Sequence, residues 1–500
     1  MASEAFTEKP PAGEPVKLVR GLGLMDSTTL VVGSMIGSGI FIVTADVARQ
    51  LPSPGLMLTT WVVTAIITMI AAICYGELAA AMPHSGGQYV FLREGFGPLT
   101  GFVFGWTLFL VIQTGTVAAV AIAFAKFAGV ILPSISSASW LWHIGTFGPY
   151  SMGALSIGPY DVGLNTQNLL AIFSITLLTA VNCFGIRLGA VVQNLFTFTK
   201  TGALLILALL GILIGSSSEV LQANYGNGNF WGDADWSLAT LTLIAVAMVG
   251  PVFAADAWYY ITYTGEEVKN PRRNLPLSLL LGTGIVCSIY ILTNFVYLQV
   301  LPLQGSPDGQ TLMARGIQYA AEDRVGTAAA QVIFGSAGLY LMAAAIMIST
   351  FGCNNGLILA GARVFYAMGR DKLFFQSAAR VHPKYKTPVH ALVIQGVWAC
   401  FLTLSGTYGQ LLDYITFASL LFLALTLAVM FTLRRRVGFE RPVSAWGFPW
   451  LPILYFILVG FIEINLLIYK PLYTWPGLVI VLLGIPVYYL WRGRGEGRGN

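Results

Sequence analysis

Val32-Gly33-Ser34-Met35-Ile36-Gly37-Ser38-Gly39-Ile40-Phe41 lies in the middle of the first long apolar run of the chain. Three glycines and two serines fall within seven of these residues. Each glycine weakens a helix by roughly 1 kcal/mol relative to alanine. We therefore expect the first apolar helix to unwind at this stretch. A simpler interpretation, a face of small residues packed against a neighbouring helix, stays open for this stretch taken alone.

A second stretch of helix-breaking residues, Gly250-Pro251-Val252-Phe253-Ala254-Ala255-Asp256-Ala257-Trp258, lies in the sixth apolar run. Pro251 removes one helical hydrogen bond, and Asp256 places a carboxylate among apolar residues. Interrupted helices at the first and sixth positions predict two inverted repeats of five helices each. Because five is odd, the second repeat would enter the membrane from the opposite side.

The rest of the chain is rich in apolar residues and poor in charge. Of its 500 residues, 56% are hydrophobic and only 10% are charged, whereas a soluble domain carries roughly 25% charged residues. A membrane-spanning helix needs about 20 apolar residues. Twelve apolar runs are candidate spans: 26–48, 56–82, 98–133, 165–184, 189–215, 237–264, 275–302, 327–368, 388–405, 409–433, 448–469 and 474–491. The sequence thus predicts an all-α polytopic membrane protein with 12 transmembrane helices, in which the long run at 327–368 bends or projects beyond the bilayer.

The lysines and arginines divide unevenly between alternate loops. One set of loops holds four: Arg49, Arg315, Arg324 and Lys470. The other set, with both tails, holds twenty: Lys9, Lys17, Arg20, Arg93, Arg187, Lys269, Arg272, Arg273, Arg370, Lys372, Arg380, Lys384, Lys386, Arg434, Arg435, Arg436, Arg441, Arg492, Arg494 and Arg498. The positive-inside rule places the richer set and both termini in the cytoplasm. The net charge of +5 therefore needs no nucleic acid to explain it.

These assignments divide the chain into four parts. We expect a cytoplasmic tail at 1–18, a ten-helix inverted-repeat core at 19–435, helices 11 and 12 at 436–491, and a second cytoplasmic tail at 492–500. The protein would lie in a plasma or inner membrane, in contact with lipids, and the sequence leaves its oligomeric state open.

The two expected breaks would present backbone groups of opposite character. Peptide groups in a bilayer must find partners. Amide groups at the start of a half-helix attract an anion, and carbonyl groups at the end of one attract a cation. A small zwitterion between the two breaks would satisfy both, and an α-amino acid is the common molecule of that shape. The breaks therefore favour an amino acid as the ligand.

Residues suited to other chemistry are scarce. The four histidines lie at or near loops, and the sequence contains no P-loop, Rossmann fingerprint or metal-spaced cluster. The five cysteines lie inside apolar runs and include no CxxC pair: Cys74, Cys183, Cys287, Cys353 and Cys400. We therefore expect neither an enzyme, nor a metal site, nor a cofactor. A channel fits broken helices in two repeats less well than alternating access does, whereas an amino acid sensor of transporter descent stays open.

Several motifs, in order along the chain, resemble the amino acid–polyamine–organocation superfamily. The segments that carry this resemblance are Gly37-Ser38-Gly39-Ile40-Phe41, Tyr75-Gly76-Glu77-Leu78, Pro83-His84-Ser85-Gly86-Gly87-Gln88-Tyr89 and the run 266–276 from Glu266 to Pro276. Similarity to the L-type amino acid transporters and their bacterial relatives comes from Asn182-Cys183-Phe184-Gly185-Ile186-Arg187, Val192-Gln193-Asn194, Lys200, Glu440-Arg441-Pro442 and Gly484-Ile485-Pro486-Val487-Tyr488. Together the motifs cover about residues 20–490.

The resemblance implies a LeuT-type fold of five plus five inverted helices, with helices 1 and 6 broken, and alternating access. It implies that amide groups at Gly37, Ser38 and Gly39 hold the substrate carboxylate. The carbonyls of Phe253 and Ala254, with Asp256 nearby, would hold the amino group. The ring of Phe253 would form a lid, and the side-chain pocket would be lined by Met35, Ile112, Trp258 and Phe417.

Two departures from the family pattern bear on these expectations. The family usually has glycine before the tryptophan of the sixth helix, where this chain has Ala257, which limits the room for a substrate side chain. Animal L-type proteins carry a cysteine for a partner subunit between helices 3 and 4. Residues 134–164 contain none, so no disulfide-linked partner is implied.

Lys200 is the most informative ionisable residue in the apolar runs. It lies 13 residues after Arg187, or about 20 Å along a helix, which places it near the middle of a bilayer. The resemblance implies that a lysine here stands in for the sodium ion of related transporters and ties helix 5 to the break in helix 1, with Ser349 as a neighbour. Two roles stay open, a proton carrier and a permanently charged tether. Glu463, in the eleventh run, has no assigned role.

The apolar character of the expected pocket favours neutral amino acids as cargo. A cationic side chain would need an acid of its own, and Asp256 is already matched to the amino group. A cationic amino acid or polyamine antiporter is the alternative. Sodium-independent exchange and proton-coupled symport both stay open.

Overall fold

Helices make up most of the protein in a computed structural model that describes residues 20–496, apart from 52, 149, 153–154, 158–159, 233 and 405–407. The predicted tail at 1–18 and the last residues of the predicted tail at 492–500 lie outside the described residues. The helix that precedes them extends to Glu496.

The helices of the first half include two that are separated only by the expected first break. Their bounds are α1 (Leu24–Met35), α2 (Gly39–Gln50), α3 (Pro54–Ala81), α4 (Gln88–Phe96), α5 (Pro98–Thr107), a π-helical segment η1 (Leu108–Ile112), α6 (Gln113–Ile131), α7 (Thr166–Cys183), α8 (Ile186–Leu210), a second π-helical segment η2 (Gly211–Gly215) and α9 (Ser218–Tyr225). Local capping explains where several begin. The Asn165 side chain, for example, accepts a hydrogen bond of 2.7 Å from the Asn168 amide at the start of α7.

The second half contains the other expected break and the longest helix. The bounds are α10 (Leu238–Ala247), α11 (Val249–Ala254), two 3₁₀ turns η4 (Trp258–Tyr263) and η5 (Gly265–Glu267), α12 (Pro271–Val300), α13 (Leu312–Arg315), α14 (Val325–Arg370), α15 (Val389–Leu402), α16 (Tyr408–Leu433), α17 (Trp450–Tyr469) and α18 (Pro471–Glu496). Helix α14 spans 46 residues and is interrupted at Gly335, whose φ of 67° is not helical. This interruption confirms the bend expected in the run at 327–368.

Ten helical segments in the described part of the chain are long and apolar enough to cross a membrane. They are Leu24–Gln50, Pro54–Ala81, Pro98–Ile131, Thr166–Cys183, Asn194–Gly215, Pro271–Val300, Val325–Arg370, Ile415–Leu433, Trp450–Tyr469 and Thr474–Trp491. Two shorter apolar helices, Leu238–Ala254 and Val389–Leu402, coincide with the two remaining predicted runs, 237–264 and 388–405. The chain is therefore a multi-pass membrane protein, and its total of twelve spans stays a prediction.

The segment between α6 and α7 differs from the all-α prediction. Strand β1 (Trp140–Phe147) pairs antiparallel with β4 (Tyr160–Asn165), and β2 (Tyr150–Met152) pairs with β3 (Leu155–Ile157). The sequence explains the difference, because Gly148-Pro149 and Gly158-Pro159 prevent a helix and favour turns between short apolar stretches. The all-α assignment is therefore wrong for this segment.

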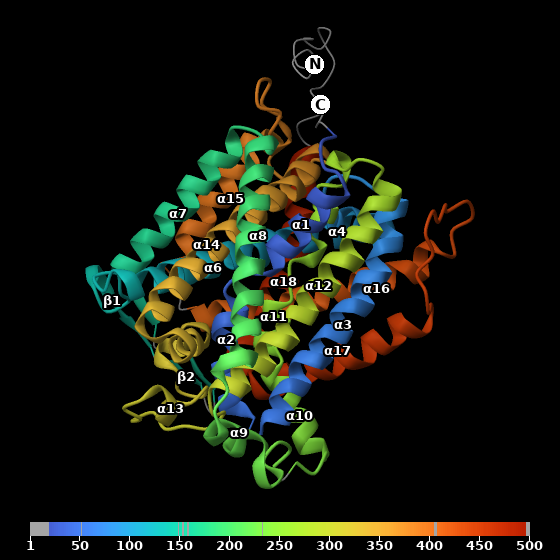
Figure 1. Cartoon of the computed structure of the whole chain (residues 1–500). Coiled ribbons are helices and arrows are strands. Elements are labelled where there is room, and N and C mark those ends of the chain that lie inside the picture. The colour runs from blue at the N-terminus through green and yellow to red at the C-terminus, as the bar shows by residue number, and fades with distance from the viewer. Residues whose placement is uncertain are drawn as a thin grey trace, which may run out of the picture.

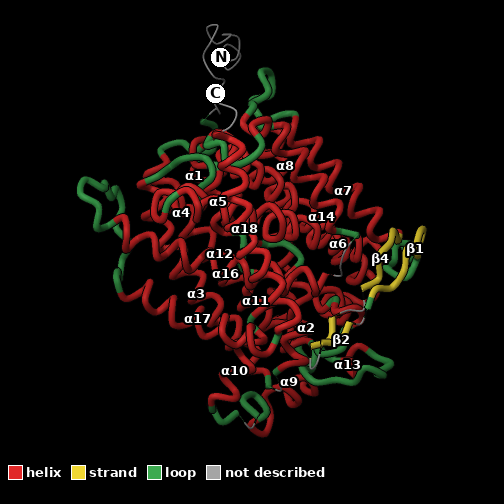
Figure 2. Tube along the Cα trace, turned by 180° about the vertical axis from the view of Figure 1, so that it is seen from behind, coloured by secondary structure: helices red, strands yellow, loops and turns green. Residues whose placement is uncertain are grey.

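The long helices form one bundle with distinct ends. Helices α9, α10 and α13 lie at one end, and α4 and the start of α1 lie at the other (Figures 1 and 2). Contacts agree with the pictures at the second end. Leu22, just before α1, forms a bridge with Val268, and the Trp491 indole near the end of α18 donates a hydrogen bond of 3.1 Å to the Lys372 carbonyl after α14. Several of the basic residues sorted into one set of loops thus lie at one end of the bundle.

Candidate functional site

The first break separates α1 from α2 at residues 36–38. A helix normally leaves its last four carbonyl groups without partners inside the helix. Here two of these carbonyls receive hydrogen bonds from side chains of other helices. The Cys353 thiol on α14 donates to the Ser34 carbonyl at 3.0 Å, and the Tyr290 hydroxyl on α12 donates to the Met35 carbonyl at 2.9 Å.

The remaining two carbonyls at this helix end contact Lys200. This lysine on α8 is buried, with 1% of its surface exposed. Its Nζ atom donates to the Gly33 carbonyl at 2.5 Å and to the Ile36 carbonyl at 2.6 Å. It also lies 3.5 Å from the Ser349 carbonyl, and the Ser349 hydroxyl donates to the Ile36 carbonyl at 3.2 Å. The structure therefore places Lys200 and Ser349 together at the first break.

The second break follows α11. Residues 255–257 leave the α-helical conformation, and the chain continues as the 3₁₀ turn η4. Ala257 has φ 64° and ψ 5°, the left-handed conformation that glycine adopts most easily. Asp256 is buried, and its Oδ2 atom accepts a hydrogen bond of 3.3 Å from the Ser419 hydroxyl on α16. The second break thus presents a carboxylate held by a neighbouring helix.

The two breaks are in contact with each other. A Cβ atom placed on Gly39 would lie 2.5 Å from the Cβ atom of Ala254. One turn further along the same crossing, a Cβ atom on Gly250 would lie 2.8 Å from that of Val43. Helices α2 and α11 therefore approach more closely than side chains would allow, and Gly39 is required for the approach.

The structure places the predicted pocket residues as follows. Met35 ends α1, and Phe253 and Ala254 end α11, so all three border the breaks. Trp258 begins η4, with its ring centroid 4.9 Å from that of Tyr75 on α3. Their side chains are buried.

Two further pocket residues lie on other elements. Phe417 is on α16, two residues before Ser419, and α16 packs against α11. Ile112 ends η1, which packs against α16. Both side chains are buried. At the first break, a Cβ atom on Gly37 would lie 3.1 Å from the Cys353 sulfur.

A buried ion pair, which the sequence did not indicate, lies between η5 and α14. Arg363 Nε donates to Glu267 Oε1 at 2.9 Å, and Nη2 donates to Oε2 at 3.3 Å. Both side chains are 1% exposed. The Glu267 carbonyl also accepts hydrogen bonds of 2.9 and 3.0 Å from the amides of Gly21 and Leu22. The segment that precedes α1 is thus held against the end of the second broken helix.

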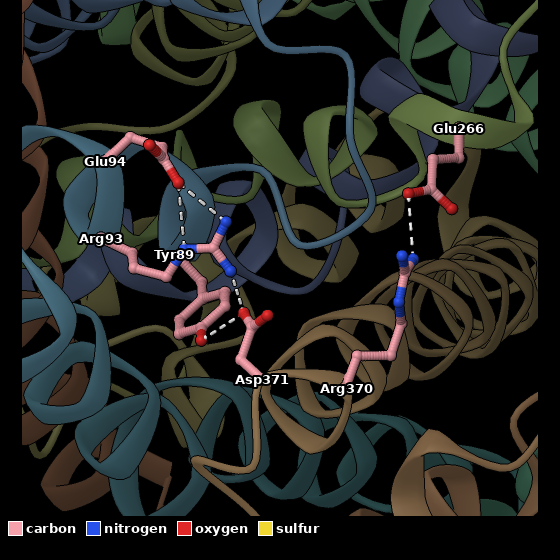
Figure 3. A network of polar contacts seen from close by, with 6 residues as sticks. All are labelled: Tyr89, Arg93, Glu94, Glu266, Arg370 and Asp371. Carbon is pink, nitrogen blue, oxygen red and sulfur yellow. Dashed lines mark hydrogen bonds and ion pairs between the residues drawn. The ribbon is translucent and has the colours of Figure 1, made fainter.

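A second set of contacts closes the same end of the bundle (Figure 3). Arg93 on α4 forms an ion pair with Asp371, which follows α14, and Arg370 pairs with Glu266 at 3.3 Å. The Tyr89 hydroxyl donates to Asp371 Oδ2 at 2.7 Å. Partial burial, together with this carboxylate, raises the pKa of Tyr89 well above its ordinary value, so the hydroxyl remains a donor. The closure network, as we call it, consists of Glu267, Arg363 and the six residues labelled in Figure 3: Tyr89, Arg93, Glu94, Glu266, Arg370 and Asp371.

Sequence reasoning missed the closure network and the partners Cys353 and Tyr290 at the first break. The ion pair between Glu267 and Arg363 joins residues 96 positions apart, so no local pattern reveals it. All five cysteines are free in the structure. In the described part of the chain, no three His, Cys, Asp or Glu side chains are placed to hold a metal ion.

Comparison with known proteins gives consistent matches over almost the whole chain. The model of a family described as "amino acid permease" matches residues 22–488. Large neutral amino acids transporter small subunit 2 of Oryctolagus cuniculus is 30% identical over 498 residues, 98% of this chain and 83% of that protein. The b(0,+)-type amino acid transporter 1 of Mus musculus is 28% identical, over 94% of this chain and 88% of the relative. The Asc-type amino acid transporter 1 of Homo sapiens is 27% identical, over 97% of this chain and 85% of the relative.

Proposed function

The chain belongs to the amino acid permease family, and we propose that it moves amino acids, with a preference for neutral ones, across a membrane by alternating access. One observation carries the proposal: the two broken helices meet at Gly39 and Ala254, so the start of α2 lies beside the end of α11. A role in transport, as distinct from catalysis, follows from the family.

The proposed architecture is a LeuT-type repeat of twelve helices. The first helix is α1 with α2, and the sixth is α10 with α11 and η4. Ten long apolar segments and two shorter ones coincide with the twelve predicted runs, which supports this count. Both termini are proposed to face the cytoplasm, because basic residues gather at the end of the bundle that holds Leu22 and Trp491.

Substrate recognition is proposed to use the backbone at both breaks. Lys200, Cys353, Tyr290 and Ser349 occupy the carbonyl groups at the end of α1. These contacts leave the start of α2 as the anion-attracting element of this break, suited to a carboxylate. The carbonyls of Phe253 and Ala254 with Asp256 would receive the amino group.

The preference for neutral cargo rests on the lining of the proposed pocket. Met35, Ile112, Trp258 and Phe417 are buried and apolar. Asp256 already accepts a hydrogen bond from Ser419 and lies at the position proposed for the amino group. A cationic substrate would need a further acid.

Coupling is proposed to depend on Lys200 as a fixed tether between α8 and the first break. Three carbonyl oxygens surround its Nζ atom at 2.5, 2.6 and 3.5 Å, matching the three donors of an ammonium group. Because this cation is part of the protein, transport would not need sodium. The closure network would open and re-form during each cycle, in exchange or in proton-coupled symport.

A competition experiment in proteoliposomes tests the proposed function. Vesicles containing the purified protein are loaded with a labelled neutral amino acid, and each of the twenty amino acids and a polyamine is offered outside, with and without a pH gradient. We expect neutral apolar amino acids to compete best. Stronger competition by cationic amino acids or the polyamine would favour the antiporter alternative. Binding without any flux would favour a sensor.

A further inference from the structure

The connection between α16 and α17, residues 434–449, projects from the side of the bundle in both views (Figures 1 and 2). Its base is fixed by Glu77, a fully buried carboxylate on α3. Arg434 Nε donates to Glu77 Oε1 at 2.8 Å, and the Ala445 amide donates to Oε2 at 2.7 Å. The Arg434 guanidinium also lies 3.7 Å from the centroid of the Phe448 ring. The loop is therefore a built structure with a defined outer surface.

That outer surface carries two exposed tryptophans. Trp446, in the turn before α17, is 79% exposed, and Trp450, the first residue of α17, is 74% exposed. Trp450 also begins a stripe of exposed apolar side chains along α17: Ile453, Leu454, Ile457, Ile464 and Ile468. On a membrane-spanning helix, this stripe is the surface that meets lipid. Tryptophans at the end of such a stripe are typical of the headgroup level.

The arginines of this loop differ in their contacts with the described residues. Arg434 is paired with Glu77, and the Arg436 guanidinium donates to the Glu94 carbonyl at 2.5 Å. Arg435 and Arg441, by contrast, are exposed and form no ion pair with any described residue. A guanidinium group matches a phosphate in geometry and charge. The loop thus combines free guanidinium groups with aromatic rings at the proposed bilayer surface.

We propose that the loop at 434–450 binds the headgroup of an anionic phospholipid in the adjacent leaflet. Arg435 and Arg441 contact the phosphate, Trp446 and Trp450 lie at the level of the glycerol backbone, and the acyl chains follow the exposed stripe of α17. Charge complementarity and continuity with the lipid-facing stripe favour this occupant over a second copy of the chain. The inference rests on α17 being a membrane span and is independent of which substrate is moved.

Native mass spectrometry of the full-length protein in neutral detergent tests this site. The protein is titrated with phosphatidylglycerol and, separately, with phosphatidylcholine of the same acyl chains. We expect wild-type protein to prefer phosphatidylglycerol. In the Arg435→Gln/Arg441→Gln variant, the affinity for phosphatidylglycerol should fall about tenfold, since each basic residue near a headgroup raises the affinity several-fold. The matched control, Arg380→Gln/Lys384→Gln, removes two exposed charges from another loop at the same end of the bundle and should bind like wild type.

Three outcomes would overturn the proposal. These are an equal loss in the control variant, no preference for phosphatidylglycerol over phosphatidylcholine, or conversion of a dimer into monomers by the loop substitutions, which would assign the surface to a second copy. Trp446→Ser keeps every charge and gives an independent measurement should the double variant fail to fold. It is expected to weaken the phosphatidylglycerol adduct, and unchanged binding in this variant would also contradict the proposed site. Lipid binding is measured without transport, so its failure is distinguishable from failure of the proposed function.

Discussion

Gly39, at the start of α2, lies so close to Ala254, at the end of α11, that an added Cβ atom would come within 2.5 Å of the alanine Cβ and 2.8 Å of its Cα. Neither atom belongs to a flexible side-chain end that can move away. The contact joins the first broken helix to the second, and it fixes the distance between the backbone groups that we propose as the two halves of the substrate site.

Gly39→Ala is expected to impair substrate binding in a folded protein, and Gly39→Val more so, because either side chain would push the two breaks apart. We expect affinity to fall by about tenfold or more, equivalent to about 1.4 kcal/mol. Gly202→Ala is the matched control, since a Cβ atom there has nothing within 4 Å. Binding can be measured in detergent by isothermal calorimetry. Wild-type affinity in both Gly39 variants would show that the close approach matters only for packing.

Substitutions of Ala257 should distinguish the effect of backbone strain from that of side-chain crowding at the second break. Its left-handed conformation costs a residue other than glycine roughly 1–2 kcal/mol. Ala257→Gly is therefore expected to be at least as stable as wild type, whereas Ala257→Val, with a β-branched side chain, should lower the apparent melting temperature in detergent. Equal melting temperatures for the valine and glycine variants would contradict this account.

The local features of the site could be predicted from the sequence, because they depend on the intrinsic preferences of neighbouring residues. Glycines at 33, 37 and 39 and Pro251 weaken a helix wherever it packs, and the structure interrupts the helices at these stretches. The depth of Lys200 in a bilayer stays a prediction from helical rise. Its contact with the first break, which the family resemblance implied, is present as hydrogen bonds to the Gly33 and Ile36 carbonyls.

Features that arise only from packing escaped prediction. The pairing of Glu267 with Arg363 depends on how η5 meets α14, and the left-handed φ of Ala257 depends on the chain around it. Strand pairing between β1 and β4 likewise joins segments that look like an irregular loop in sequence. In each case the feature depends on residues that are distant in the sequence, whereas intrinsic preferences depend only on near neighbours.

Lys200→Met is expected to abolish both exchange and pH-dependent net uptake. The substitution keeps the apolar length of the side chain but removes the donor that serves the Gly33 and Ile36 carbonyls. Ser349 still donates to the Ile36 carbonyl, whereas the Gly33 carbonyl loses its donor, which costs about 1–3 kcal/mol. Lys384→Met, at an exposed loop position, is the control. Exchange with substrate on both sides should be compared with uptake driven by a proton gradient. Retained exchange with lost pH dependence would favour a proton carrier, and full activity would remove Lys200 from the mechanism.

Sodium should have no effect on the initial rate of uptake. The Lys200 ammonium contacts the carbonyls of Gly33, Ile36 and Ser349, and we propose that it takes the place of a sodium ion there. The measurement replaces sodium by choline at constant pH, ionic strength and membrane potential. A rate that rises with sodium concentration under these conditions would mean that a cation binds elsewhere.

Substitutions of Glu267 and Arg363 should have strongly non-additive effects on the stability of the protein. Removing one partner leaves the other charge buried, which costs about 3–5 kcal/mol, whereas replacing both by apolar residues is often neutral. We therefore expect Glu267→Leu and Arg363→Met each to lower the apparent melting temperature strongly, and the double variant to recover much of the loss. The exposed pair of Arg272 with Glu440 is the control. Because solvent screens this pair, its single and double substitutions should lower the apparent melting temperature only slightly. Exchange in the recovered double variant then tests the closure network directly. If the charged contact must form and break in each cycle, transport stays impaired although the fold is restored, and normal transport in that variant would leave the pair with a structural role only.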